Sequence, residues 1–246
     1  MSSDSISVPS AEELAELNAR FAEASPEQIL GWATATYPTD IILTCSFQHE
    51  GVVLAHMLRT IKPDVPVVFI NTRFHFKETL EYRDAIVKML GLNLREIGPK
   101  MTFEEFKKRH GQDLYNRDPD LCCKINKVDP LLEALNGVRA WINGRRRDQS
   151  VTRSNISHVD LQGRIVKINP LAHWASKDTY RYLHAHNIPL NPLFEKGYTS
   201  VGCEPCTSLP LSEDDERSGR WASSGKRECG IHTVLNTGGE DGSKTD

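Results

Sequence analysis

The sequence has little that is typical of membrane proteins, nucleic-acid-binding proteins or secreted proteins. No apolar run approaches the roughly 18 residues that suggest a membrane-spanning helix. The formal net charge is −3 and aromatic residues make up 7 % of the chain, which gives little support to the broad basic face and aromatic platforms of a nucleic-acid-binding module. Residues 1–10 are rich in serine and do not read as a secretory signal. We therefore expect a cytoplasmic protein with neither a membrane nor a nucleic acid as partner.

Cysteine is also scarce, and its spacing is informative. The chain has six cysteines, which in a reducing compartment are poor candidates for disulfides. Cys122 and Cys123 are adjacent, and Cys203 and Cys206 form a Cys-x-x-Cys pair. Four thiolates suit either zinc or an iron–sulfur cluster. Adjacent cysteines are awkward ligands for one small ion and easier ligands for a cubane with separate iron atoms. The spacing alone leaves zinc, a cluster and four inert buried cysteines open.

The two remaining cysteines have different surroundings. Cys45 lies within an apolar run and is interpreted as a small core residue. Cys229 follows Lys226 and Arg227 in a polar segment, and such surroundings lower a thiol pKa and keep the thiol accessible. We interpret Cys229 as a reactive nucleophile. His232 is either a substrate contact at the same site or an ordinary surface residue.

Apolar runs of strand length alternate with stretches of helical spacing from residue 40 onward. Strands are predicted at 40–46, 66–72, 92–97, 138–143 and 164–168, and helices at 51–61, 76–90, 103–109, 125–135 and 176–184. Near-continuous apolar runs are typical of strands buried on both faces. The sequence therefore predicts an α/β fold in which a mostly parallel, twisted sheet carries helices on both faces.

The predicted organisation has three parts. Residues 1–39 form a helical lead-in, because Ser10 with Glu13 and Ser25 with Pro26 are patterns of helix N-termini. Residues 40–211 form the main domain. Residues 212–246 form a polar, mobile C-terminal segment that carries Cys229.

Side chains that could bind an anion follow the predicted strands. In sheets of this kind, bound molecules lie beyond the carboxyl ends of the strands. Residues 44–51 run from a strand into a helix, where free N–H groups and the hydroxyl of Ser46 favour a phosphate. Guanidinium groups bind phosphate or sulfate oxygens in pairs. The candidates are Arg145, Arg146 and Arg147 after a strand, and Arg217 and Arg220 further on. A solvated basic loop is the alternative interpretation of the arginine triplet.

Together these motifs resemble the assimilatory, thioredoxin-dependent adenylyl-sulfate reductases, which have an adenine-nucleotide alpha-hydrolase-like fold. The resemblance extends over residues 40–232 and depends most on CCKINKV at 122–128, residues 141–153, GCEPCT at 202–207, ERSGRW at 216–221 and ECGIH at 228–232. The sequence departs from the family pattern at Gln48-His49 and at Asn71–Arg73.

The resemblance implies a role for each matching residue. One [4Fe-4S] cluster is expected on Cys122, Cys123, Cys203 and Cys206, with Lys127 beside it. Ser46 is expected in the phosphate loop, and Arg217 and Arg220 on the substrate anions. Cys229 is expected to attack the sulfur of adenylyl sulfate, to carry a thiosulfonate, and to release sulfite when thioredoxin or a related dithiol reduces it.

Several alternatives remain beside this reductase. A reductase for 3′-phosphoadenylyl sulfate, or one with dual specificity, resembles the family but commonly lacks the four cluster cysteines. A tRNA-thiolating enzyme of the same fold needs a Ser-Gly-Gly-x-Asp-Ser loop, which is absent. A zinc-stabilised RNA-binding module is the non-enzymatic alternative. The oligomeric state is open, and a homo-oligomer is compatible with the sequence.

Overall fold

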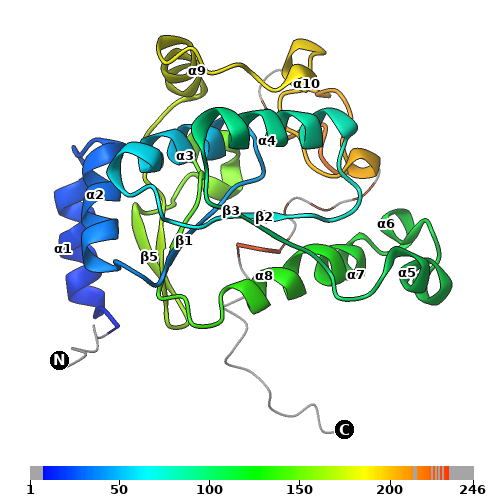
Figure 1. The fold of residues 1–246 in the computed structure, drawn as a ribbon, viewed down its shortest axis with the longest axis horizontal. Coiled ribbons are helices and arrows are strands. Elements are labelled where there is room, and N and C mark those ends of the chain that lie inside the picture. The colour runs from blue at the N-terminus through cyan, green and yellow to red at the C-terminus, as the bar shows by residue number, and fades with distance from the viewer. Residues whose placement is uncertain are drawn as a thin grey trace, which may run out of the picture.

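The strands form one mixed sheet. The computed structural model describes residues 8–212, 215–222, 224, 226, 228 and 230–232. Within these residues six strands lie in the order β3-β2-β1-β4-β6-β5. Only β5 runs antiparallel to its neighbour, so the predicted mostly parallel sheet is confirmed (Figure 1). The strands are β1 Ile41–Thr44, β2 Val67–Ile70, β3 Leu94–Ile97, β4 Ala140–Ile142, β5 Val159–Gln162 and β6 Ile165–Ile168.

Helices cover both faces of this sheet, as the sequence predicted (Figure 1). One face carries α2 Pro26–Thr36, α3 His49–Ile61 and α4 Lys77–Leu90, with α9 Ser176–Ala185 packed on α3 and α10 Pro192–Glu195 packed on α4. The other face carries α5 Phe103–His110, α6 Leu114–Arg117, α7 Pro119–Cys123 and α8 Asp129–Ala134. At the β5 edge lies α1 Ala11–Phe21, whose Asn18 donates to the Val159 carbonyl at 2.7 Å. None of the described helices is long and apolar enough to cross a bilayer.

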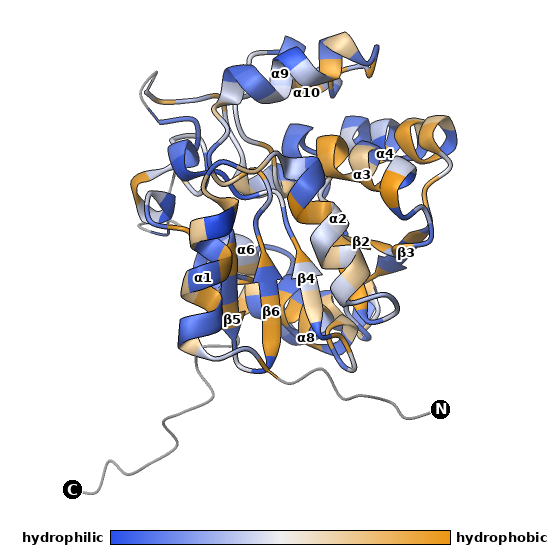
Figure 2. Ribbon diagram, turned by 90° about the vertical axis from the view of Figure 1, so that its left-hand side faces the viewer, coloured by the Kyte–Doolittle hydropathy of each residue, from blue (hydrophilic) through white to orange (hydrophobic). Residues whose placement is uncertain are grey.

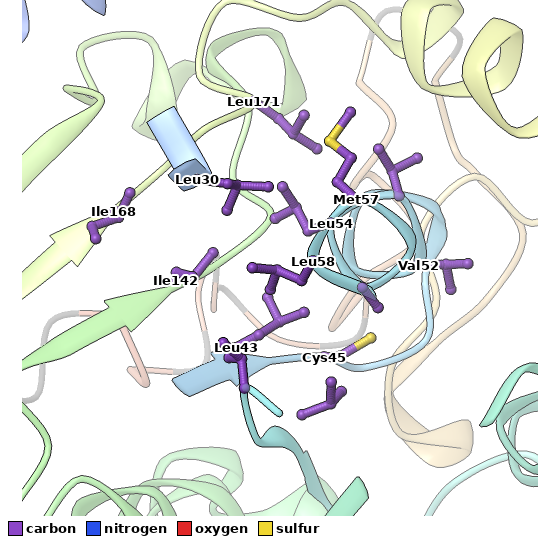
Figure 3. Close-up of a cluster of buried hydrophobic side chains, with 14 of the residues drawn as sticks. Leu30, Leu43, Cys45, Val52, Leu54, Met57, Leu58, Ile142, Ile168 and Leu171 are labelled. Atoms are coloured by element: carbon purple, nitrogen blue, oxygen red, sulfur yellow. The ribbon is translucent and has the colours of Figure 1, made fainter. Parts of the chain in front are cut away.

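Successive residues of the central strands contribute to two separate cores, because side chains alternate across a sheet. Leu43, Ile142 and Ile168 point into the larger core, which Figure 3 shows between the sheet and α3. Ile42 and Trp141 point into the smaller core, which lies between the sheet and α8. Figure 2 shows the corresponding apolar bands along β4 and β6. Strands that are apolar on both faces are therefore fully buried.

Local sequence signals account for several helix boundaries. Ser10 and Ser25 each cap a helix through a reciprocal capping box, with Glu13 and Gln28 respectively, and Pro26 occupies the first turn of α2. Cys45 is 3 % exposed within the larger core, so its interpretation as a core residue is confirmed.

Several parts of the chain differ from the prediction, among them the short helices α6 and α10, which were not predicted. The strand β5 was not predicted, because Val159–Gln162 is half polar and pairs only at the sheet edge through a tight turn at Gly163, where φ is 60°. The helix predicted at 125–135 begins earlier and is interrupted. The chain forms α7, then a π-helix at Lys124–Val128, and then α8.

The buried His158 makes the stability of this fold depend on pH. Its Nδ1 faces the Asn169 carbonyl at 3.1 Å and its Nε2 faces His173 at 2.9 Å. Burial, followed by the neighbouring His173, lowers the pKa of His158 to about 4 from the usual 6.5. The unfolded chain therefore takes up this proton first as the pH falls.

We expect the free energy of unfolding to decrease between pH 6.5 and 4, and His158→Asn to remove about 1–3 kcal/mol of that decrease. Asparagine retains a donor for the Asn169 carbonyl but does not titrate. Urea denaturation at pH 7 and pH 4.5 measures the difference, with the exposed His184→Asn as control. Equal pH dependence of both variants would contradict the assignment.

Candidate active site

A pocket opens where the strand order reverses. β1 pairs with β2 on one side and with β4 on the other, so the loops after β1 and β4 leave the sheet at the same edge. Residues from both loops line the pocket, together with segments at 199–203, 216–221 and 228–232. The two loops are in close contact, since a Cβ on Gly144 would lie 2.7 Å from the Cβ of Glu50. The sequence correctly pointed to this edge.

The loop after β1 presents free donors to the pocket. Ser46 is exposed, and the helix α3 begins at His49 without a side-chain cap, so its first N–H groups remain available for an anion. Gln48 donates to the Ser46 hydroxyl at 3.2 Å and accepts from the Val201 N–H at 3.1 Å. The His49 ring packs 3.8 Å from the ring of Phe194. Gln48 and His49, which depart from the family pattern, thus connect the loop after β1 to Val201 and Phe194.

Arg146 is the centre of a buried ion-pair network. It is 1 % exposed and donates to Glu50 and Glu216, each at 2.9 Å, and also to Asp148. These carboxylates belong to α3, to the segment at 216–221 and to its own loop. Arg146 therefore fixes the shape of the pocket, and its binding to a substrate anion stays a prediction.

The other two arginines of the triplet differ from Arg146. Arg145 lines the pocket, burial lowers its pKa to about 10, and its Nε is buried without a hydrogen-bond partner. Arg147 is not brought to the pocket, because its Nε donates to the Ile156 carbonyl at 2.8 Å. Arg153, which the sequence prediction did not select, lines the pocket and is 6 % exposed.

Four cations surround the buried ring of Trp221. Arg220, Lys226, Arg217 and Lys127 lie 4.7, 5.8, 5.9 and 6.0 Å from its ring centroid. The negative face of an indole attracts cations, so this ring partly offsets their mutual repulsion. The φ of Trp221 is 51°, an uncommon value for a residue other than glycine. The predicted ligands Lys127, Arg217 and Arg220 are thereby brought together.

Arg220 lies directly over the backbone of the Cys203 loop. Its Nη1 donates to the Val201 carbonyl at 3.1 Å, and the side chain is 9 % exposed. A Cβ on Gly202 would lie 1.9 Å from Nη2 of Arg220, so only glycine leaves room for this guanidinium.

Described residues on either side of the predicted nucleophile, namely Glu228, Ile231 and His232, line the same pocket. Cys229 and Arg227 lie outside the described residues, whereas Glu228, Gly230, Ile231 and His232 are described. Glu228 accepts two hydrogen bonds from Arg153, both at 2.9 Å, and is paired with Arg217 at 3.3 Å. Burial raises the pKa of Glu228, but Arg153 and Arg217 outweigh this effect and lower it below its usual value.

His232 is held between the sheet and the pocket. Its ring stacks on Trp141 with centroids 5.7 Å apart, and its carbonyl accepts from Gln162 at 2.6 Å and from Lys167 at 3.1 Å. Burial, followed by the charge of Lys167, lowers the pKa of His232 well below 6.5, so the imidazole is neutral near pH 7.

The four remaining cysteines border a second, smaller pocket. Cys122 and Cys123 end α7, and Cys203 and Cys206 flank a 3₁₀ turn at Glu204–Cys206. Asn126 donates to the Cys122 sulfur at 3.6 Å, and the Thr72 hydroxyl hydrogen-bonds with the Cys203 sulfur at 3.2 Å. Lys127 and Cys203 line both pockets. The four predicted metal ligands are therefore brought together beside the anion pocket.

The donor set fits a soft-metal centre, either zinc or an iron–sulfur cluster. Burial, and then the neighbouring Cys123 and Cys203, raise the pKa of Cys122 to about 12, so the four thiols cannot all ionise without a compensating cation. Thiolates around one zinc lie about 3.8 Å apart, given a Zn–S bond of about 2.3 Å. In the described part of the chain no group of three or more Cys, His, Asp or Glu is arranged for one ion. The identity of the metal centre on these thiols stays a prediction.

Comparison with known proteins identifies the family. A sequence profile of the phosphoadenosine phosphosulfate reductase domain matches residues 40–209. The chain belongs to this family. Relatives of this family member include the adenosine 5′-phosphosulfate reductases of Geobacillus thermodenitrificans, 45 % identical, and Bacillus thuringiensis strain Al Hakam, 44 % identical. Both alignments cover 83 % of this chain and 88 % of the relative.

Solved structures agree with the membership of this reductase family. A phosphoadenylyl-sulfate reductase from Candida auris, in a phosphate complex, has a TM-score of 0.74 and 31 % identity, and covers 81 % of this chain and 98 % of its own. The FMN adenylyltransferase of Candida glabrata, at a TM-score of 0.54 and 16 % identity over 89 % of this chain and 76 % of its own, shares the fold alone.

Replacement of Gly202 by alanine tests the anion pocket of this family member. Gly202→Ala is expected to displace Arg220 and to weaken binding of inorganic phosphate at least about tenfold, because one charged hydrogen-bonding group contributes about 1.5–3 kcal/mol. Isothermal titration calorimetry measures the affinity. Gly31→Ala is the control, since a Cβ there meets nothing within 4 Å. Unchanged affinity of Gly202→Ala would exclude Arg220 from the anion site.

Proposed function

We propose that this chain reduces adenylyl sulfate to sulfite with release of AMP, as a step of sulfate assimilation. The relatives that are 44–45 % identical carry the name of this activity. The structural observation that carries the proposal is the junction of two pockets, in which Lys127 and Cys203 line both the cation-rich pocket and the four-cysteine pocket. A substrate with two linked anionic groups suits the first pocket, and a soft metal cluster suits the second.

The cations divide between the two anionic groups of the substrate. The start of α3 and Ser46 are placed to receive the phosphate, as free helical N–H groups favour anions. Arg145 has an unpartnered Nε, and Arg217 and Arg220 surround Trp221 on the side of the cysteine loop. In this proposal these arginines neutralise the sulfate and the departing phosphate.

Cys229 is the proposed nucleophile. Its thiolate attacks the sulfur atom, a sulfur–sulfur bond forms, and the bond from sulfur to the phosphate oxygen breaks with AMP as leaving group. A thiolate of a dithiol then attacks the Cys229 sulfur, and sulfite leaves with the electron pair of the broken bond. The second thiol of the donor resolves the mixed disulfide, so the donor supplies both electrons. Thioredoxin or a related protein fits the role of this dithiol donor.

Cys122, Cys123, Cys203 and Cys206 would hold one [4Fe-4S] cluster. When bound, it compensates the charge of four thiolates and polarises the adjoining anion pocket. Two of the sulfurs are oriented by hydrogen bonds: Asn126 donates to Cys122, and the Thr72 hydroxyl shares a hydrogen bond with Cys203.

A reductase for 3′-phosphoadenylyl sulfate is the second candidate. The Candida auris neighbour with this name is 31 % identical, below the 44–45 % of the adenosine 5′-phosphosulfate reductases. The higher identity favours adenylyl sulfate.

The decisive experiment separates the two half-reactions. Mixed with adenylyl sulfate and no dithiol, the holoenzyme is expected to release about one AMP per chain and to gain a sulfonate on the peptide that contains Cys229. Nucleotide release from 3′-phosphoadenylyl sulfate is expected at least about tenfold slower, a difference of about 1.4 kcal/mol in the transition state. Rapid quenching and peptide mass spectrometry measure both.

Cys229→Ser is expected to abolish the burst and the adduct while nucleotide still binds. Cys45→Ser is the matched thiol control, because Cys45 lies in the core. An adduct on any other cysteine would refute the mechanism, and faster release from the 3′-phosphorylated substrate would reverse the assignment.

The anaerobically purified protein is expected to contain about four iron and four sulfide per chain. Cys203→Ser is expected to lose them, since a hydroxyl is a poor ligand for soft metals, and Cys45→Ala is expected to keep them. Metal analysis and the visible absorption of the cluster report the outcome. Stoichiometric zinc without iron would contradict the assignment.

A further inference from the structure

A fully buried lysine lies in the centre of strand β6. Lys167 is 0 % exposed, and it shares a sheet face with Trp141, its register partner on β4. Its ammonium lies 4.7 Å from the centroid of the Trp141 ring. Lysine is almost never fully buried unless it is paired. Here the hydrogen-bond acceptors are neutral, namely the Gln162 side chain at 3.2 Å and the His232 carbonyl at 3.1 Å.

Lys167 and Gln162 form a rigid pair of donors for one carbonyl. They lie on opposite arms of the β5–β6 hairpin, in which Gln162 pairs with Ile165 and Asp160 pairs with Lys167. Gln162 donates to the His232 carbonyl at 2.6 Å, so this single oxygen receives two hydrogen bonds. The stack of the His232 ring on Trp141 fixes the same residue from the side.

The chain is held on both sides of Cys229. On one side Glu228 is fixed by Arg153 and Arg217, and on the other His232 is fixed by the hairpin. We propose that Lys167, together with Gln162, is a positioning residue that seats residues 230–232 on the sheet and thereby restrains the segment that carries Cys229. This inference rests on the proposed function for the chemistry of Cys229, but the seating itself does not.

Packing alone does not explain a lysine at this position. Burial, and then the charge of Arg145, lowers the pKa of Lys167 to about 7, because a desolvated site next to a cation disfavours the ammonium. An apolar residue of similar volume commonly replaces a buried charge without loss of stability. A lysine is useful here because it reaches the carbonyl of a segment distant in sequence.

Lys167→Met in the full-length holoenzyme tests the proposal. Methionine fills the same volume but cannot donate to the His232 carbonyl, so the thermal midpoint is expected to stay the same or rise. Iodoacetamide is expected to alkylate Cys229 about fivefold faster or more, because the segment is released from its seat. AMP release without dithiol is expected to slow about tenfold, while KM for adenylyl sulfate changes less than about twofold.

The sign of the alkylation effect separates position from charge. Loss of a nearby positive charge alone raises the pKa of a thiol and slows its alkylation. Gln162→Leu removes the second donor without any change of charge and is expected to act in the same direction as Lys167→Met. Lys177→Met, on the exposed surface of α9, is the matched control.

Alkylation and AMP release equal to those of the wild type in both variants would overturn the proposal and leave Lys167 as a residue of the core. Because alkylation needs no turnover, it tests the seating of residues 230–232 separately from the proposed reduction of adenylyl sulfate. A wild-type enzyme that does not act on adenylyl sulfate, yet whose variants are alkylated faster, would refute the proposed function and keep the seating.

Discussion

The repulsion between cations at one edge of the sheet governs the architecture of this protein. Arg145, Arg153, Arg217 and Arg220 line one pocket, in which like charges repel and lose hydration. Carboxylates from distant segments offset part of this charge, since Glu228 pairs with Arg153 and Arg217. The face of Trp221 offsets a further part. What remains is a surplus of positive charge held in fixed geometry, which is the condition for binding a doubly anionic ligand without reorganisation.

The anion pocket and the cysteine pocket are mechanically one unit. The backbone N–H of Trp221 donates to the Cys206 carbonyl at 3.0 Å, and Arg220 forms a β-bridge with Thr207. A ligand set that fixes Cys203 and Cys206 therefore also fixes Arg220 and Trp221. Because both pockets share Lys127 as well, any disturbance of the thiols is transmitted to the groups that face the anion.

The sequence predicted the fold, because periodicity and caps are local signals, and it predicted that the two cysteine pairs would meet. That these cysteines hold a metal centre stays a prediction. The sequence could not tell which arginines are available for an anion, since Arg145 and Arg146 are neighbours in one triplet and differ only in their partners in the fold. Those of Arg146, Glu50 and Glu216, lie 96 and 70 residues away. The edge strand β5 was missed because half of its residues are polar. One signal was present and overlooked: a lysine in the otherwise apolar Ile165–Ile168 strand. The position of Cys229 stays a prediction.

The ion-pair network of Arg146 has a consequence for the order in which the molecule is made. Among the described residues the last strand of the sheet ends at Ile168, whereas Glu216 follows it well downstream in the chain. During synthesis the sheet is complete before Glu216 leaves the ribosome, so Arg146 is at first only partly neutralised. Domains fold from the N-terminus as they emerge. A chain truncated before Glu216 would therefore display a finished scaffold without a finished pocket, and a nascent chain cannot complete the Arg146 network before Glu216 has emerged.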